Sequence, residues 1–387
     1  MTSLVGRVSA GLRRPAGLRG VVLAGGLALT VAAVADWPTF RGDSARTGRG
    51  AAPIAAQPTL LWKAWLGGSV DGSPVVASGT VWVGTNRGMF AALDVATGAV
   101  RWRVSLEGAV CSAAALARNR LVIGTARRFL YCLGLDGKVL WRARAGDAVV
   151  ASPLVLGETC YWGSMDGVFH ATRLSDGAKV WQVGLSGSIS AAAASDGERI
   201  FVGDEAGSVW ALSPTDGRVL WKVDTSCHVM AAPVFADGRL LVPLVSPTRL
   251  VPPEIPYLMV LNPDTGEELW HIRGPRSIFA SPVMMPMGVA YVSVEGYLSD
   301  TFWRAHSADG TREIYKQRLG GVVDSSPAWA EDMAYFGAHD GCVYAVRLSD
   351  GVVVSRTKLA AKIFSSPALD GGKLYIGASD GHLYCLQ

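Results

Sequence analysis

A repeat of about 40 residues is the feature that most constrains this chain. A tryptophan ends an apolar run six times, at intervals of 40, 39, 40, 40 and 49 residues. The six residues are Trp62, Trp102, Trp141, Trp181, Trp221 and Trp270. Tyr315 and Ser355 take the same place in two further copies. A period of this length is typical of β-propellers, in which each copy forms one four-stranded blade. We predict that each Trp docks its outer strand on the neighbouring blade.

Two further positions recur with the same period. A glycine closes the second predicted strand of six copies, whereas Pro243 and Ser293 replace it in the fifth and sixth copies. The glycines are Gly84, Gly124, Gly163, Gly203, Gly337 and Gly377. A small residue and a proline open the first strand at Ser73-Pro74, Ser152-Pro153, Ala232-Pro233, Ser281-Pro282, Ser326-Pro327 and Ser366-Pro367. Together the three series indicate a propeller rather than any other repeat architecture.

The ends of the repeat predict how the ring closes. The last copy stops at Gln387 after three strands and lacks its Trp strand, and residues 59–66 contain a Trp strand with no strands before it. Joined, the two segments complete one blade. We therefore predict an all-β, eight-bladed propeller of four-stranded antiparallel blades, closed by pairing of the N-terminal Trp strand with the C-terminal blade. This closure also removes two exposed sheet edges.

Residues 1–35 differ from the rest and predict a signal peptide. Four arginines and no acidic residue precede or flank an apolar run over residues 21–34, which ends in the small-x-small sequence of residues 33–35. The run is shorter than the roughly 20 residues that span a bilayer. We expect cleavage and a periplasmic or secreted protein with no stable membrane span; an uncleaved anchor is the alternative. Residues 36–58 are predicted to be an irregular lead-in whose Trp37 and Phe40 pack against the body, and residues 59–387 the propeller.

The charge balance argues against nucleic-acid binding. The chain has 36 basic and 32 acidic residues, and four of the basic ones belong to the predicted signal peptide. The remaining 32 basic residues balance the acidic ones. A chain with no net positive charge lacks the main driving force for neutralising phosphates. We exclude nucleic acids as partners on this basis.

The copies resemble a known repeat. Segments such as FAALDVATGAVRW (90–102) and LMVLNPDTGEELW (258–270) are similar to the quinoprotein (PQQ-like) propeller repeat over residues 60–387. DWPTFRGDSARTG (36–48) resembles the start of many mature members of that family. The resemblance implies one of two branches: dehydrogenases that bind pyrroloquinoline quinone (PQQ) and calcium, or non-catalytic scaffolds such as the outer-membrane assembly factor BamB.

The chain departs from the dehydrogenase branch. The adjacent Cys pair and long cavity-forming loops of that branch are missing from the sequence, and no catalytic Asp or calcium-ligand set can be assigned to its residues. We therefore expect no cofactor and an exported binding or scaffold module. The alternatives are a small PQQ-dependent dehydrogenase that oxidises an alcohol or sugar, and a periplasmic ligand sensor.

The remaining motifs do not indicate a catalytic nucleophile or a metal site. The GxSxG match at residues 377–381 holds the same repeat position as a strand-turn-strand hairpin, so it is not a nucleophile elbow. The six histidines show no zinc spacing and no EF-hand loop is present, so we predict no metal site. The six cysteines are predicted to be buried free thiols, with Cys111 and Cys227 the two that merit a check for a disulfide.

Two loops break the repeat and predict the binding face. The loop between the second and third strands is extended in the fifth copy (residues 245–257) and in the sixth (residues 294–303). Consecutive blades place these loops side by side on one rim, and loops carry function more often than the scaffold does. We predict that a protein or peptide partner binds this blade 5–6 loop face of a monomer or of one subunit in a complex.

The residues that directly precede the first strands define the mouth on the same face. They are Asp71, Cys111, Val150, Ser190, Met230, Phe279, Asp324 and Phe364. Their mixture of apolar and charged side chains suits a peptide or small molecule. With the neighbouring loops, the candidate binding residues are Asp71, Arg127, Arg128, His228, Arg276, Tyr297, Asp324 and Lys362.

Overall fold

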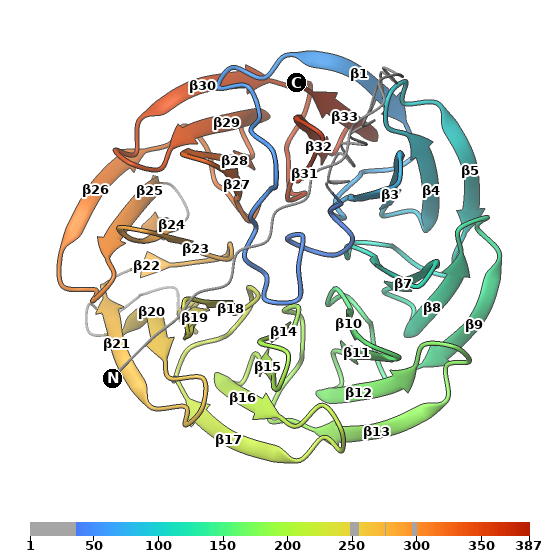
Figure 1. The fold of residues 1–387 in the computed structure, drawn as a ribbon, viewed down its shortest axis with the longest axis horizontal. Coiled ribbons are helices and arrows are strands. Elements are labelled where there is room, and N and C mark those ends of the chain that lie inside the picture. The colour runs from blue at the N-terminus through green and yellow to red at the C-terminus, as the bar shows by residue number, and fades with distance from the viewer. Residues whose placement is uncertain (1–35, 248–254, 275, 296–299) are drawn as a thin grey trace, which may run out of the picture. The chain divides into compact units, whose positions relative to one another are not determined.

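Eight β-sheets arranged around a central axis form the body of the protein (Figure 1). The computed structural model describes residues 36–247, 255–274, 276–295 and 300–387. All regular structure in these ranges is β-strand, and none of them contains a helix long and apolar enough to cross a membrane. The eight-bladed, all-β prediction is confirmed. The predicted signal peptide lies outside the described residues.

Each of the first four blades is a four-stranded antiparallel meander whose strands follow one another from the axis outward. Blade 1 comprises β2 (Val75–Ala77), β3 (Thr80–Gly84), β4 (Met89–Asp94) and β5 (Val100–Ser105). Blade 2 comprises β6 (Ala115–Ala117), β7 (Arg120–Gly124), β8 (Phe129–Gly134) and β9 (Val139–Arg144). Blade 3 comprises β10 (Leu154–Leu156), β11 (Thr159–Gly163), β12 (Val168–Arg173) and β13 (Lys179–Gly184). Blade 4 comprises β14 (Ala194–Ser195), β15 (Ile200–Gly203), β16 (Ser208–Leu212) and β17 (Val219–Asp224).

The remaining blades follow the same order, with one addition. Blade 5 comprises β18 (Val234–Ala236), β19 (Arg239–Pro243), β20 (Pro256–Leu261) and β21 (Glu268–Arg273). Blade 6 comprises β22 (Arg276–Ser277), β23 (Val283–Met285), β24 (Gly288–Glu295), β25 (Asp300–Ser307) and β26 (Glu313–Arg318). Blade 7 comprises β27 (Ala328–Ala330), β28 (Met333–Gly337), β29 (Cys342–Arg347) and β30 (Val353–Lys358). The fifth strand of blade 6 differs from the prediction: β22 pairs with the end of β24, which is long enough to accept it.

Blade 8 joins the two ends of the repeat. It comprises β31 (Ala368–Asp370), β32 (Lys373–Gly377), β33 (His382–Leu386) and β1 (Leu60–Trp65). β1 pairs antiparallel with β33, so that Trp62 lies opposite Cys385 and Trp65 opposite His382. The predicted closure is therefore confirmed. Without this pairing β33 would present an unpaired edge to solvent.

The recurring glycine of the second strand is required by the next blade. A β-carbon at Gly84 would lie 2.1 Å from Cγ1 of Val110, and one at Gly203 would lie 2.1 Å from Cγ1 of Val229. Such contacts are far inside van der Waals range, so only glycine fits. The packing partners of the six glycines are Val70, Val110, Val149, Ile189, Val229 and Ile363. Ile278 and Val323 hold the same repeat position in blades 6 and 7, and all eight residues are at most 1% exposed. These contacts define the inner seam between neighbouring blades.

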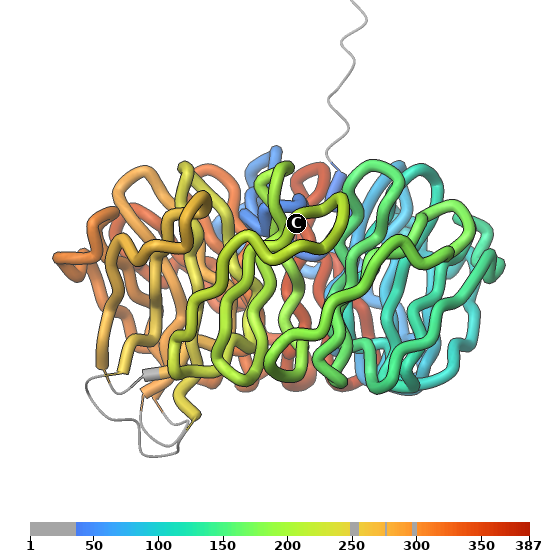
Figure 2. The backbone as a smooth tube through the Cα atoms, turned by 90° about the horizontal axis from the view of Figure 1, so that it is seen from below, coloured from blue at the N-terminus to red at the C-terminus, as the bar shows by residue number. Residues whose placement is uncertain are grey.

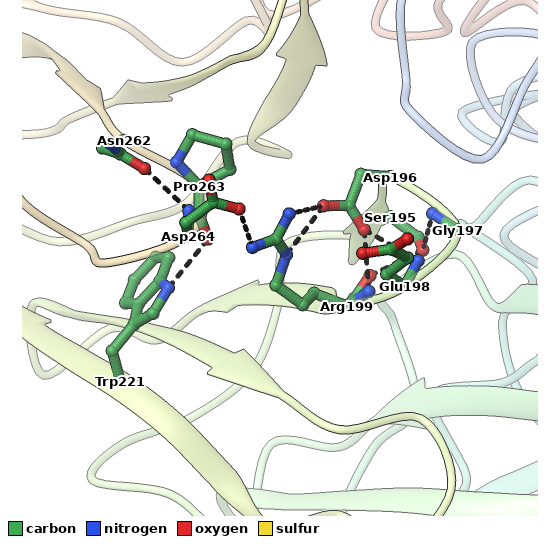
Figure 3. Close-up of polar contacts among 9 residues, drawn as sticks. All are labelled: Ser195, Asp196, Gly197, Glu198, Arg199, Trp221, Asn262, Pro263 and Asp264. Atoms are coloured by element: carbon green, nitrogen blue, oxygen red, sulfur yellow. Dashed lines mark hydrogen bonds and ion pairs between the residues drawn. The ribbon is translucent and has the colours of Figure 1, made fainter.

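The repeated Trp forms the outer seam. The Nε1 of Trp221 in blade 4 donates to the carbonyl of Pro263 in blade 5 at 2.9 Å (Figure 3). A β-carbon at Gly266 would lie 2.8 Å from the same indole, so the ring covers this turn. Beside it, Arg199 pairs with Asp196 at 2.8 Å and with Asp264 of blade 5. The Nε1 atoms of four other members of the series donate to a carbonyl of the next blade at 2.7–3.1 Å, namely Trp62, Trp102, Trp141 and Trp181.

The lead-in crosses the middle of the ring (Figures 1 and 2). Its backbone bonds to the inner strands of five blades, whereas the sequence predicted only an irregular segment packed against the body. The N–H groups that donate to lead-in carbonyls at 2.7–3.0 Å belong to Val76, Leu116, Ser195, Phe235 and Trp329. Trp37 is 2% exposed. The lead-in is therefore a central part of the propeller and ties its blades together.

Two buried arginines fasten this lead-in. Arg41 uses all five of its N–H groups at 2.6–3.1 Å, two of them within the lead-in and three on carbonyls of blades 6 and 7. Arg46 reaches the carbonyls of Ala193 at 2.8 Å and Pro153 at 3.2 Å, in blades 4 and 3. Burial lowers the pKa of Arg41 to about 9 and that of Arg46 to about 10, so both remain charged at neutral pH. The arginines thereby hold two different sides of the ring to one segment.

Candidate functional site

A cavity of about 190 Å³ lies on the axis, at the beginning of the inner strands. All eight residues of the predicted mouth line it, from Asp71 in blade 1 to Phe364 in blade 8. Phe40 of the lead-in also forms part of its wall, which the sequence did not indicate. We call the eight residues the mouth ring.

The mouth ring differs from the positions on either side of it. Each preceding residue is one of the buried Val or Ile residues of the inner seam, and each following residue is Gly, Ala or Ser. The mouth residues are chemically diverse between these two uniform positions. Met230 is 41% exposed and Phe364 is 37% exposed. The repeat therefore fixes the backbone and leaves one side chain per blade free to face the cavity.

The small-residue-Pro signature supports the cavity wall by linking blades. The N–H of Ser281 donates to Oγ of Ser326 at 2.9 Å, and the N–H of Ser326 donates to Oγ of Ser366 at 2.9 Å. The N–H of Ser366 in turn donates to Oγ of Ser73 at 3.0 Å, across the point of ring closure. The buried serines at these positions thus serve as staples from blade to blade. Ser73, Ser326 and Ser366 also line the cavity.

Asp71 and Asp324 are the two acidic residues that line the cavity. Asp71 accepts a hydrogen bond from Ser69, and Asp324 lies 3.0 Å from Nε2 of His339. Partial desolvation in the cavity wall, together with the negative charge of Asp71, raises the pKa of the Cys111 thiol. No lysine or arginine is among the described residues that line the cavity. The site is therefore acidic and partly apolar.

Several of the other predicted residues lie outside the cavity wall. Arg128 is 4.0 Å from Asp147, and Lys362 is exposed. His228 bonds to the carbonyl of Glu205 and forms a backbone bridge with Val245. The structure does not bring these three side chains, or that of Arg127, into the lining of the cavity. Arg276 belongs to β22, and Tyr297 lies outside the described residues.

The described bases of the two extended loops lie together. The N–H of Ser246 donates to Oγ of Ser277 at 3.3 Å, and the N–H of Gly274 donates to the carbonyl of Ile255 at 3.2 Å. On the blade 6 side, the fully buried guanidinium of Arg304 pairs with Glu295 and Glu313. Residues 248–254 and 296–299 of these loops lie outside the described part. Ser277 also pairs with Val294 at the start of the blade 6 loop, so the two bases are adjacent. The binding role assigned to this face stays a prediction.

The cysteines follow the predicted pattern with one exception. All six thiols are free, and four of them are buried. Cys342 is partly buried, whereas Cys111 is exposed at the mouth ring. The prediction of buried thiols was therefore wrong for Cys111, because a residue in the mouth ring faces the cavity instead of a blade. The described residues contain no group of three or more His, Cys, Asp or Glu that is able to hold a metal ion.

Curated relatives match part of the chain. The outer membrane protein assembly factor BamB of Xanthomonas campestris is 35% identical over 118 residues, covering 30% of this chain and 29% of that protein. That of Moranella endobia is 26% identical over 140 residues, covering 32% of this chain and 36% of that protein. The matched region therefore spans about a third of the length of these relatives.

A solved structure and a family model extend the likeness to most of the chain. The crystal structure of BamB from Moraxella catarrhalis has a TM-score of 0.73 and 16% identity, covering 85% of this chain and 99% of that one. At this identity the likeness establishes the fold alone. The model of the family described as "Beta-alanine-activating enzyme, beta-propeller" matches residues 66–387. The chain belongs to this family of PQQ-like β-propellers.

Proposed function

We propose that the protein is an extracytoplasmic scaffold that binds a segment of a partner protein at the mouth ring. The observation that carries this proposal is the contrast between the diverse mouth ring and the uniform positions beside it. A repeat that maintains packing on both sides of a variable side chain provides a rigid frame for recognition. The partial matches to the outer membrane protein assembly factor BamB support a role in such an assembly. The predicted signal peptide supports its location.

The chemistry of the ring indicates the kind of segment that fits. Met230, Phe279 and Phe364 supply apolar surface, and Asp71 and Asp324 supply negative charge. Exposed apolar side chains at the centre of a contact contribute most of the binding energy in protein interfaces. A partner segment with an apolar side chain next to a Lys or Arg complements both features. The acidic pair then selects the segment by charge.

A quinone is a poorer match for the cavity. PQQ carries three carboxylates, and a site for it requires cationic side chains to compensate them. The described lining has two aspartates and no lysine or arginine, and its volume is about 190 Å³. We therefore propose that the protein works without PQQ and calcium. Incubation with both should give no bound chromophore and no dye-linked oxidation of alcohols or sugars. Stoichiometric quinone binding together with such activity would overturn the scaffold proposal and identify a dehydrogenase.

Crosslinking at the mouth tests the scaffold proposal. A photoreactive amino acid at Met230 should crosslink one protein partner in the cell envelope, and the Asp71→Asn/Asp324→Asn double variant should weaken its capture by tenfold or more. Leu140→Ser provides the control, because Leu140 is 48% exposed on the outer strand of blade 2, outside the cavity. Capture that survives the double variant, or that Leu140→Ser abolishes equally, would place the binding surface elsewhere.

A further inference from the structure

Trp65 breaks the repeat at the end of an outer strand. It is 60% exposed, the highest fraction among the large apolar side chains of the described ranges. In the other seven copies this position holds serine, glycine or a charged residue: Ser105, Arg144, Gly184, Asp224, Arg273, Arg318 and Lys358. Exposed apolar residues such as Leu140 and Leu220 directly precede the repeated Trp and so belong to the repeat. Trp65 has no such explanation.

A second cavity, of about 330 Å³, lies beside Trp65 at the junction of blades 8 and 1. This volume is within the range of small-molecule sites. It is separate from the central cavity, and no residue lines both. Its lining consists of Trp65, Gly67, Gly68, Ser69, Asn86, Arg87, Ser379, Asp380 and Gly381. We call it the closure pocket, because its walls come from the two ends of the repeat.

Glycines lie next to the indole of Trp65 and leave it uncovered. A β-carbon at Gly381 would lie 3.2 Å from Nε1 of Trp65, and one at Gly67 would lie 3.8 Å from Cη2. The ring therefore extends between two positions that carry no side chain. At Gly68 a β-carbon would lie 3.0 Å from both Oδ1 of Asn86 and Cγ of Arg87. The glycines thus bring the aromatic ring and two polar side chains to one pocket.

The polar groups of the pocket include both hydrogen-bond donors and hydrogen-bond acceptors. Asp380 accepts hydrogen bonds from the Tyr384 hydroxyl at 2.5 Å and from the backbone N–H of His382 at 3.1 Å. Among the described residues, neither the side-chain amide of Asn86 nor the guanidinium of Arg87 has a hydrogen-bond or ion-pair partner, and both residues are exposed. The pocket therefore offers donors and acceptors around one aromatic ring, and its single Arg and single Asp leave it with no net formal charge.

We propose that the closure pocket binds one pyranose unit of a saccharide. A pyranose has a face of C–H groups and a rim of hydroxyls that both donate and accept hydrogen bonds. The C–H face matches the exposed indole, and the rim matches Asn86, Arg87 and Asp380. An anionic ligand would meet Asp380 and a cationic one Arg87, so the balanced pocket favours a neutral hydroxylated ligand. The two sites share no lining residue, although Ser69 of the closure pocket donates a hydrogen bond to Asp71 of the mouth ring, and the saccharide proposal does not rest on the scaffold role.

Saturation-transfer NMR on the full chain tests the proposal, followed by calorimetry. The probes are soluble oligosaccharides of glucose, mannose, galactose, N-acetylglucosamine and glucuronate. We expect at least one neutral oligosaccharide to bind, at least tenfold more weakly to Trp65→Ala and three- to tenfold more weakly to Arg87→Ala. Ser105→Ala, at the same repeat position in blade 1, should bind as the wild type does. Arg87 lies in a turn outside the strands, so its variant keeps the test valid if Trp65→Ala impairs closure of blade 8.

The outcomes separate this proposal from the scaffold role. Absence of binding across the panel would overturn the saccharide site, and so would binding that persists in both Trp65→Ala and Arg87→Ala. A protein partner that crosslinks at residue 65 instead of a saccharide would also overturn it. The Asp324→Asn single variant leaves the hydrogen bond between Ser69 and Asp71 intact and should retain saccharide binding, so loss of partner capture in that variant tests the scaffold role alone.

Discussion

The seams between blades and the mouth ring are neighbours in sequence but differ in what constrains them. Val229 belongs to the inner seam, where it contacts Gly203 of the preceding blade and is fully buried. Met230, the next residue, is 41% exposed and lines the central cavity. The comparison shows that the repeated residues make the contacts between blades, whereas the side chain varies at positions that no neighbouring blade constrains. The variants below test how contacts between segments, unlike the mouth ring, determine stability, in order of decreasing expected effect.

Replacing Arg41 by Ala should have the largest effect. It removes five hydrogen bonds and leaves carbonyls of blades 6 and 7 buried without a donor. Each buried group left unsatisfied costs about 1–3 kcal/mol. We expect the free energy of unfolding to fall by about 4 kcal/mol in urea melts. Arg49→Ala is the control, since Arg49 is exposed and should cost under about 1 kcal/mol. Equal effects of the two variants would show that the lead-in does not tie the blades together.

Adding one methyl group to the inner seam should have the next largest effect. The β-carbon of Gly203→Ala would meet Val229 at 2.1 Å, and overpacking of this kind costs about 1–3 kcal/mol. Gly184→Ala is a matched control, because nothing lies within 4 Å of its β-carbon. It should change stability by less than about 0.5 kcal/mol, as should Met230→Ser in the mouth ring. Thermal melts in which all three variants behave alike would contradict the division between seam and mouth.

A histidine inside blade 3 should make stability depend on pH. His170 is 9% exposed and stacks on Trp162 with ring centroids 3.9 Å apart. Burial lowers its pKa to about 4. The unfolded chain therefore binds this proton first as the pH falls from 6.5 towards 4, and the folded state loses stability over that window. Between pH 7.5 and pH 5 this group should cost about 2 kcal/mol.

His170→Phe isolates that contribution. The variant keeps an aromatic ring against Trp162 but has no group that titrates. Urea melts at pH 7.5, 6 and 5 should show its stability relative to the wild type rising as the pH falls. A difference that is constant across this range would mean that His170 titrates alike in the folded and unfolded chains.

The architecture followed from the sequence because each repeat position serves a contact that recurs in most of the eight blades. The Trp, Gly and Ser-Pro series predicted the blades before any contact was known, and the unmatched strand at residues 59–66 predicted the closure. The mouth ring could be located because its residues hold one fixed place relative to those series. In each case a contact that repeats from blade to blade requires the same residue type at a regular spacing in the sequence.

Features that occur only once have no repeating sequence pattern from which they could be predicted. Arg41 and Arg46 stand in an irregular segment, and nothing in their spacing showed that they clamp separate pairs of blades. Trp65 lies three residues after the Trp of its strand, where an apolar residue is easily taken for part of a strand. The fifth strand of blade 6 required knowledge that β24 extends to Glu295. Such features depend on contacts between segments distant in sequence, which a single sequence does not record.

The central position of the lead-in also governs the order in which the molecule can be built. The lead-in and β1 are among the first described segments to be synthesised, whereas β33, with which β1 pairs, is among the last. The blades must therefore fold around a lead-in whose following strand, β1, has no pairing partner until β33 has been synthesised. Contacts between such distant segments slow folding. Completion of blade 8 is therefore expected to be among the last steps of folding.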